Sequence, residues 1–274
     1  MPGPTYAQSF NVRAAAAESA QAHQNEELGD QQVYDPMRAT VQPSFRSTPW
    51  QETEGQEEAR EHGRLLFVSE SNVCRSVLAE AFLQRMITEA GLAEKVTIES
   101  KACRDYNVGD RPDPAVLRAA GEIGLSLAEN KVAELFDPAR DIGMYDMVLV
   151  MDKFTASDVL REVSIFDTIS KENSYTRKVR RLGEFHPSLV SKGASDDQDI
   201  GDPLYGNTGG PEEQVAVQEV AELINEACRG LLAFLQGIDR RGVDTQQSFR
   251  HCLQDATQNM EGIDWMVPPM LQKK

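Results

Sequence analysis

Cysteine and histidine are scarce in this chain, which has four of each among its 274 residues. The cysteines form no C-x-x-C pair and share no ligand spacing with a histidine, so neither a metal site nor a disulfide scaffold is predicted. Sparse cysteines of this kind are typical of a reducing compartment. We therefore expect a protein without a metal, located in the cytoplasm or in a reducing organelle.

Long apolar runs, positive charge and nucleotide-binding loops are missing as well. No stretch approaches the roughly 20 apolar residues of a membrane-spanning helix, and the mean hydropathy is −0.46. The 28 Lys and Arg against 44 Asp and Glu give a net charge of −16, which repels nucleic acids and anionic lipids. Neither G-x-G-x-x-G nor G-x-x-x-x-G-K-[ST] follows a predicted strand, so no cofactor is expected. The 40% of hydrophobic residues are still enough to bury a core.

The first 63 residues have the composition of a tail. Ala, Gln, Glu, Ser and Pro dominate them, apolar residues recur with no sustained period, and four arginines without a lysine face ten carboxylates. This pattern predicts an acidic, disordered arm. Residues 1–17 contain no acidic residue and place Arg13 before an alanine run, which also fits the remnant of an organelle-targeting segment, for example a chloroplast one. A disordered terminus is the simpler interpretation.

A domain begins at Arg64, where strands and helices start to alternate. Residues 65–68 form a short continuous apolar run, typical of a buried parallel strand. After a loop, the apolar stripe from Val77 to Met86 has helical spacing, with Ser76 as the expected cap. The same criteria predict strands at 96–100 and 147–151 and a helix over 113–124. This alternation predicts an α/β fold, with a short four-stranded parallel sheet in a three-layer αβα arrangement.

The later elements have shorter signals. Residues 182–185 are the candidate fourth strand, and an apolar stripe over 217–235 predicts a long helix that covers one face of the sheet. The domain is therefore expected to span residues 64–238. Residues 239–274 are predicted to be a polar C-terminal appendage, in which 248–260 has the spacing of a short helix.

The loop between the first strand and the first helix carries the chemistry. Such a loop directs backbone N–H groups and the positive end of the helix dipole at one point, which makes an anion site. Arg75 adds a guanidinium that can bind a phosphate-like group through two hydrogen bonds. By themselves, these features also fit an ordinary strand-to-helix connection with a solvated arginine.

This loop and four later segments match one family in order. The loop reads V-S-E-S-N-V-C-R-S over 68–76, followed by Ala79-Glu80, and resembles the phosphate loop V-C-x-G-N-x-C-R-S of low-molecular-weight protein tyrosine phosphatases. Further matches are Tyr106-Asn107-Val108-Gly109 with Pro112-Asp113-Pro114, Met151-Asp152, Leu182-Gly183-Glu184-Phe185 and Asp202-Pro203-Leu204-Tyr205-Gly206. The resemblance covers residues 64–238 and implies the phosphotyrosine protein phosphatase I-like fold.

The resemblance also implies a role for each matched residue. In that family a loop cysteine attacks phosphorus and an aspartic acid protonates the leaving group. The catalytic positions correspond to Ser69 as the nucleophile, Arg75 as the phosphate clamp, Ser76 as the supporting hydroxyl and Asp202 as the acid. The phosphate-binding loop comprises Glu70, Ser71, Asn72, Val73 and Cys74, with Asn72 as its brace. The expected pocket wall comprises Tyr106, Asn107, Leu204 and Tyr205.

The chain departs from the family pattern at the centre of the loop. Ser69 stands where the family has cysteine, and its hydroxyl is far more basic than a thiol and has no histidine base in the pattern. Glu70 replaces an apolar pocket residue and brings a carboxylate near a phosphate dianion, while Ser71 replaces a glycine. Tyr106 replaces tryptophan and Leu204 replaces an aromatic residue, which trims the walls around a phosphotyrosine ring.

These departures leave two functions open. The first is a catalytically inactive phosphatase-like protein that acts as a binding, regulatory or assembly module, with an unidentified protein partner and a weak phosphate or phosphotyrosine ligand. The alternative is an active protein tyrosine phosphatase in which Ser69 is engineered or the changes are tolerated. Arsenate reductases share this fold and loop but also need the thiol at position 69, so that activity is disfavoured together with the phosphatase activity.

Four smaller features have mainly structural interpretations. Cys74 is expected to be a buried apolar residue. His186 is expected to be solvated or satisfied locally in its loop, with a catalytic base as the alternative. Asp202-Pro203 taken alone also fits an ordinary turn. A basic cluster of Lys178, Arg180 and Arg181 is interpreted as a solvated face, with docking of an acidic partner as the alternative.

Overall fold

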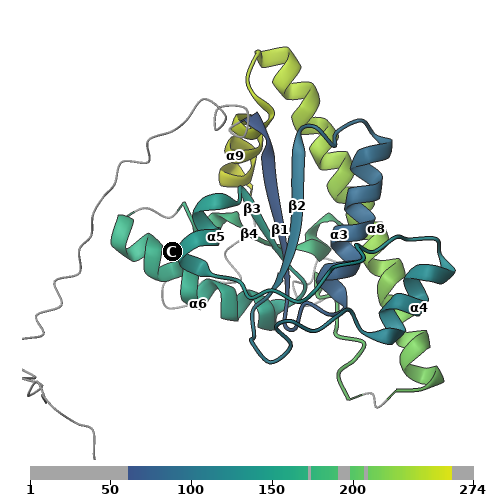
Figure 1. The fold of residues 1–274 in the computed structure, drawn as a ribbon. Helices are drawn as coiled ribbons and strands as arrows, with labels where there is room; N and C mark the ends of the chain where they lie inside the picture. The colour runs from purple at the N-terminus through teal and green to yellow at the C-terminus, as the bar shows by residue number, and fades with distance from the viewer. Residues whose placement is uncertain (1–60, 172–173, 191–197, 207–208, 261–274) are drawn as a thin grey trace, which may run out of the picture. The chain divides into compact units, whose positions relative to one another are not determined.

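The computed structural model describes residues 61–171, 174–190, 198–206 and 209–260, which form a four-stranded parallel sheet with helices on both faces (Figure 1). The strands are β1 (Gly63–Ser69), β2 (Val96–Ala102), β3 (Met147–Val150) and β4 (Val179–Arg181). Their order is β2-β1-β3-β4, and every neighbouring pair is parallel. The predicted fold class is confirmed. The acidic arm up to residue 60 and the end of the C-terminal extension, 261–274, lie outside the described residues.

Two layers of helices enclose the sheet. Figure 1 shows α3 (Arg75–Glu89), α4 (Pro114–Glu122) and α8 (Pro211–Thr245) on one side and α5 (Pro138–Met144) and α6 (Lys153–Ser170) on the other. Successive side chains of a strand point to opposite faces. Leu65 and Phe67 therefore join the core under α3 and α8, whereas Leu66 and Val68 join the core under α5 and α6. Burial on both faces explains the unbroken apolar run in the sequence.

The helix starts agree with the sequence signals at α4 but not at α3. Asp113 caps α4 by accepting the Ala115 N–H, and Pro114 occupies the first turn. At α3 the cap is Cys74, which makes no side-chain capping bond. The expectation that Ser76 caps this helix is wrong, because its hydroxyl lies inside the first turn and bonds with the preceding loop.

The fourth strand lies earlier in the chain than predicted. It spans Val179–Arg181, and the predicted strand residues form the 3₁₀ helix η2 (Leu182–Phe185). Gly183 accounts for the difference, because the backbone of Gln198 crosses directly over it. A Cβ on Gly183 would lie 1.9 Å from the Gln198 carbonyl oxygen. The chain therefore leaves the sheet at this point to make room for the segment that leads to Ile200.

The basic cluster is not a solvated face, so that interpretation is wrong. Arg180 and Arg181 are 3% and 1% exposed. Arg180 pairs with Glu184, and Arg181 pairs with Asp199 at 2.8 Å. Lys178, at the end of the short 3₁₀ helix η1 (Thr176–Lys178), donates to two backbone carbonyl oxygens at 2.9 and 3.0 Å. These cations hold the β4 edge of the sheet to its neighbours.

The C-terminal helices are joined closely to the domain. After the short α7 (Pro187–Val190), α8 runs for 35 residues and passes Ile238, the expected end of the domain. The expected short helix is α9 (Phe249–Asn259), whose Phe249 and Leu253 lie in the main core. Arg250 of α9 donates to the buried Asp146 at 3.0 Å. No helix in the described part of the chain is long and apolar enough to cross a membrane.

Replacing Gly183 with alanine is expected to destabilise the domain by about 2 kcal/mol, because the added methyl group overlaps the backbone of Gln198. Urea denaturation followed by circular dichroism measures this change. Gly121→Ala is the matched control, since Gly121 lies in α4 with open space around it. The control is expected to be neutral or slightly stabilising. Equal stability of the two variants would contradict the close approach.

Candidate anion-binding site

The candidate site lies at the carboxyl edge of the sheet, where loops follow β1, β2 and β3. The pairing of β1 with β2 continues one step past the strands, because the Cys103 N–H donates to the Ser69 carbonyl at 2.9 Å and the Arg104 N–H donates to the Glu70 carbonyl at 3.0 Å. The loop of residues 70–74 then turns into α3. Asp152 follows β3 directly and caps α6. Strand ends thus bring together residues that are far apart in the sequence.

The Ser69 hydroxyl is held inside the loop. It shares a 2.7 Å hydrogen bond with the Ser76 hydroxyl and accepts the Asn72 backbone N–H at 3.2 Å. Ser69 and Ser76 are 2% and 0% exposed. Among the described residues, no histidine or carboxylate hydrogen-bonds this hydroxyl. The geometry therefore supplies donors that would stabilise an anion at position 69 but no base that would remove the serine proton.

Asn72 braces the loop through its backbone and its side chain. Its φ of 55° is left-handed, a conformation that asparagine tolerates better than most residues. The amide nitrogen donates to the hydroxyls of Ser76 and Ser100, both at 2.8 Å. The amide oxygen accepts the Glu134 N–H at 3.1 Å. Ser100 and Glu134 were not identified from the sequence, and only the position of Ser100 in the predicted second strand could have indicated the former.

The remaining loop residues differ in their exposure to solvent. Glu70 and Ser71 are partly exposed, whereas Val73 and Cys74 are buried. The Val73 carbonyl accepts the Asp113 N–H at 3.0 Å, which ties the loop to the start of α4. The loop is thus anchored to β2, the 134 segment and α4 at once, and this leaves its backbone little freedom to rearrange.

Arg75 is 1% exposed and lies at the centre of the site. Its Nη1 donates to Asp152 and, at 3.0 Å, to the Ile200 carbonyl, while Nη2 donates to Asp202 at 2.6 Å. Its Nε has no hydrogen-bond partner among the described residues. Burial opposes the positive charge, but the carboxylates of Asp202 and Asp152 more than compensate, so the pKa of Arg75 is raised. The guanidinium therefore stays charged and keeps an unused donor.

The sequence left open whether Asp202 belongs to an ordinary turn or to the candidate site, and in the structure it belongs to both. Its Oδ1 accepts the Leu204 N–H at 3.0 Å, and its carbonyl accepts the Tyr205 N–H at 3.3 Å, as in an ordinary turn. Its Oδ2 simultaneously binds Arg75. The Asp202 carboxylate thus occupies Nη2, a guanidinium nitrogen that could otherwise donate to an oxyanion.

The predicted wall residues have different surroundings. Tyr106 is 59% exposed. Desolvation and then the nearby Glu70 carboxylate raise the pKa of its phenol. Asn107 donates to Asp110 within its own turn at 2.8 Å. Leu204 packs against the main core, and Tyr205 is 87% exposed. Of these four residues, Tyr106 is the one whose side chain is shown to interact with a residue of the loop.

Two thiols lie near Ser69, and burial disfavours the thiolate form of both. Burial and then the charge of Asp202 raise the pKa of Cys74 far above its usual range. Burial and then the charge of Asp158 raise the pKa of Cys103 to about 12. Because the thiolate is the nucleophilic form, these shifts lower the nucleophilicity of both cysteines at neutral pH. His186 accepts two backbone N–H groups of its own loop, those of Ser188 and Leu189, as expected.

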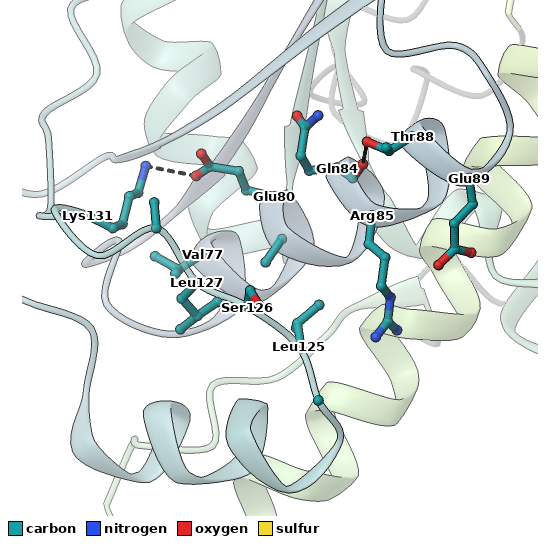
Figure 2. Close-up of a pocket in the computed structure, with 13 residues that line it drawn as sticks. Val77, Glu80, Gln84, Arg85, Thr88, Glu89, Leu125, Ser126, Leu127 and Lys131 are labelled. Atoms are coloured by element: carbon teal, nitrogen blue, oxygen red, sulfur yellow. Dashed lines mark hydrogen bonds and ion pairs between the residues drawn. The ribbon is translucent and has the colours of Figure 1, made fainter.

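A cavity of about 430 Å³ lies apart from this site, between α3 and residues 124–131 (Figure 2). Its walls include Arg85 and Leu125, and neither Ser69 nor Arg75 lines it. Figure 2 shows the ion pair between Lys131 and Glu80 at its edge, with a 2.8 Å separation. Glu80 also accepts the Ser100 hydroxyl at 2.5 Å. The cavity therefore touches the network that braces the loop, and the candidate anion-binding residues Ser69 and Arg75 lie outside its lining.

Comparison with known proteins explains this arrangement. The family model "Low molecular weight phosphotyrosine protein phosphatase" matches residues 64–241. The chain belongs to this family. A putative low molecular weight protein-tyrosine-phosphatase of Synechocystis is 27% identical over 172 residues, which cover 63% of this chain and 96% of that protein.

Solved structures share the fold of this phosphatase family. A protein tyrosine phosphatase of Entamoeba histolytica aligns with a TM-score of 0.53 at 21% identity, over 64% of this chain and 97% of that one. The YwlE arginine phosphatase of Bacillus subtilis aligns with a TM-score of 0.50 at 22% identity, over 63% and 95% of the two chains. That structure is of a cysteine-to-serine mutant whose active-site serine is phosphorylated.

Proposed function

We propose that this member of the phosphatase family binds a phosphorylated protein without hydrolysing it, and so acts as a binding, regulatory or assembly module. One observation carries the proposal: a serine lies at the position that the resemblance assigns to the nucleophile, in a loop followed by Arg75, the residue that the resemblance assigns to phosphate binding. Ser69 is held by Ser76 and Asn72, and the Nε of the buried Arg75 has no hydrogen-bond partner within the described part of the chain.

The chemistry of Ser69 argues against turnover. Phosphoryl transfer through a covalent intermediate needs a nucleophile that is ionised or has an adjacent base. A serine hydroxyl is not ionised at neutral pH, and the described residues place no base on it. The neighbouring thiols of Cys74 and Cys103 have raised pKa values and are mostly protonated. A phosphoserine, if it formed, would also be hard to hydrolyse.

The surroundings of Arg75 argue that binding persists. A charged, buried guanidinium whose Nε has no partner among the described residues, together with the start of helix α3 at the same residue, favours an oxyanion. Asp202 holds Nη2, so an incoming phosphate must displace it from that nitrogen. Breaking the bond between Asp202 and Arg75 costs part of the free energy of binding. We therefore expect the phosphate to bind weakly.

The test measures binding and hydrolysis on the same full-length protein. A fluorescein-labelled phosphotyrosine peptide is expected to bind with a Kd on the order of 10–100 µM, and its unphosphorylated form is expected not to bind. Arg75→Lys removes the fork and is expected to abolish binding, with circular dichroism confirming the fold. Aryl-phosphate hydrolysis should stay at the rate of the buffer. Turnover that depends on Arg75 would overturn the proposal.

The alternative function is an active phosphatase, and the phosphorylated serine in the YwlE mutant favours examining it. If Ser69 accepts a phosphoryl group from an aryl phosphate, mass spectrometry will find a phosphoserine at position 69, with one leaving group released per chain. We expect no such modification, because the hydroxyl has no base. A stoichiometric burst would instead identify the protein as a phosphoryl acceptor.

A further inference from the structure

Carboxylates outnumber cations around the proposed anion site. Arg75 is bonded to both Asp152 and Asp202. Glu70 follows Ser69 directly, and Asp158 lies close enough to act on the Cys103 thiol. Arg104 adds a positive charge near that thiol, but Asp158 pairs with it at 2.7 Å. A phosphate dianion entering this site meets more negative than positive charge.

Glu70 is the carboxylate best placed to act on a ligand. Its backbone is fixed at the carboxyl edge by the hydrogen bond from Arg104, and its side chain is partly exposed and lies close enough to the Tyr106 phenol to act on it. Glu70 directly follows Ser69 and is therefore a carboxylate beside the proposed anion site.

We infer that the site selects a phosphorylated residue flanked by lysine or arginine. This inference rests on the proposed function. A basic side chain next to the phosphate would pair with Glu70 and offset the repulsion between that carboxylate and the dianion. The exposed ring of Tyr106 offers the same cation a π-face. The net charge of −16 for the whole chain favours encounter with a basic partner in the same way.

The experiment compares two phosphotyrosine peptides that differ only in their flanking residues, two lysines in one and two glutamates in the other. Fluorescence anisotropy with the native full chain is expected to give about tenfold tighter binding of the lysine peptide at low salt. Glu70→Gln keeps a polar side chain of nearly the same size but removes the charge, and it is expected to reduce the preference to about threefold or less. Glu89→Gln is the matched control, since it removes one carboxylate from the exposed end of α3.

Each outcome decides the inference. Equal affinity for the two peptides, or an unchanged preference in Glu70→Gln, overturns it, and so does an equal loss in Glu89→Gln, which would assign the effect to net charge. Binding of the unphosphorylated lysine peptide as tightly as the phosphorylated one also overturns it. If neither phosphopeptide binds in a manner that depends on Arg75, the proposed function itself fails, and this result is distinct from binding without preference.

Discussion

Replacing Ser69 with cysteine is expected to create aryl-phosphate hydrolysis, with a gain on the order of a thousandfold over the native protein. The introduced thiol would receive the Ser76 hydroxyl and the Asn72 N–H as hydrogen-bond donors, at the start of helix α3. These donors and the helix dipole lower the pKa of a thiol and favour the thiolate. Release of the aryl alcohol from a chromogenic phosphate ester measures the gain.

Two companion variants show whether the gain comes from the loop. Adding Arg75→Lys to Ser69→Cys is expected to abolish it, because the transition state loses its guanidinium fork. Ser71→Cys places a thiol two residues away, in the same loop, and is expected to gain nothing. If the Ser69→Cys variant folds but hydrolyses no aryl phosphate, then Glu70 and Ser71 prevent the loop from binding the phosphate. The proposal of a retained anion site would then fail.

Replacing Lys101 with methionine is expected to cost about 3–5 kcal/mol of unfolding free energy, because it leaves a buried carboxylate without its main partner. Lys101 and Asp141 have side-chain exposures of 2% and 0%, and Nζ contacts both carboxylate oxygens at 2.9 and 2.8 Å. After the change, Asp141 keeps the Asp137 N–H and the exposed Arg140. Urea denaturation measures the loss.

A surface pair provides the control for this loss. Lys95 pairs with Asp239, and both side chains are partly exposed, so Lys95→Met is expected to cost at most about 1 kcal/mol. Combining Lys101→Met with Asp141→Leu is expected to restore most of the stability, because the uncompensated charge is gone. If Lys101→Met costs no more than Lys95→Met, the buried pair does not contribute as argued.

Much of the fold was predictable because its signals are local. The apolar run of β1, the stripe of α3 and the Asp113-Pro114 start of α4 each depend on residues within a few positions of one another. The loop motif is also continuous, so the family resemblance and the central place of Arg75 followed from the sequence. The contact of Asp202 with Arg75, across 127 positions, is seen only in the structure.

The errors occurred where long-range contacts override local pattern. The stretch 182–185 looks like a strand, but the approach of Gln198 to Gly183 turns it into a 3₁₀ helix. Arg180 and Arg181 look like surface residues, but partners up to 18 positions away bury them. Charged side chains in a short segment carry no information about which carboxylates the fold will bring to them.

The sequence by itself determined the α/β class, the family and the serine at the centre of the loop, because periodicity and a continuous motif are properties of neighbouring residues. Only the tertiary structure decided how the loop is braced and how the arginine is occupied. Ser100, Glu134 and Ile200 come from three separate segments, and the carboxyl edge of the parallel sheet brings them to the loop. Hydrogen bonds of this kind depend on distances between strands, which a linear pattern does not contain.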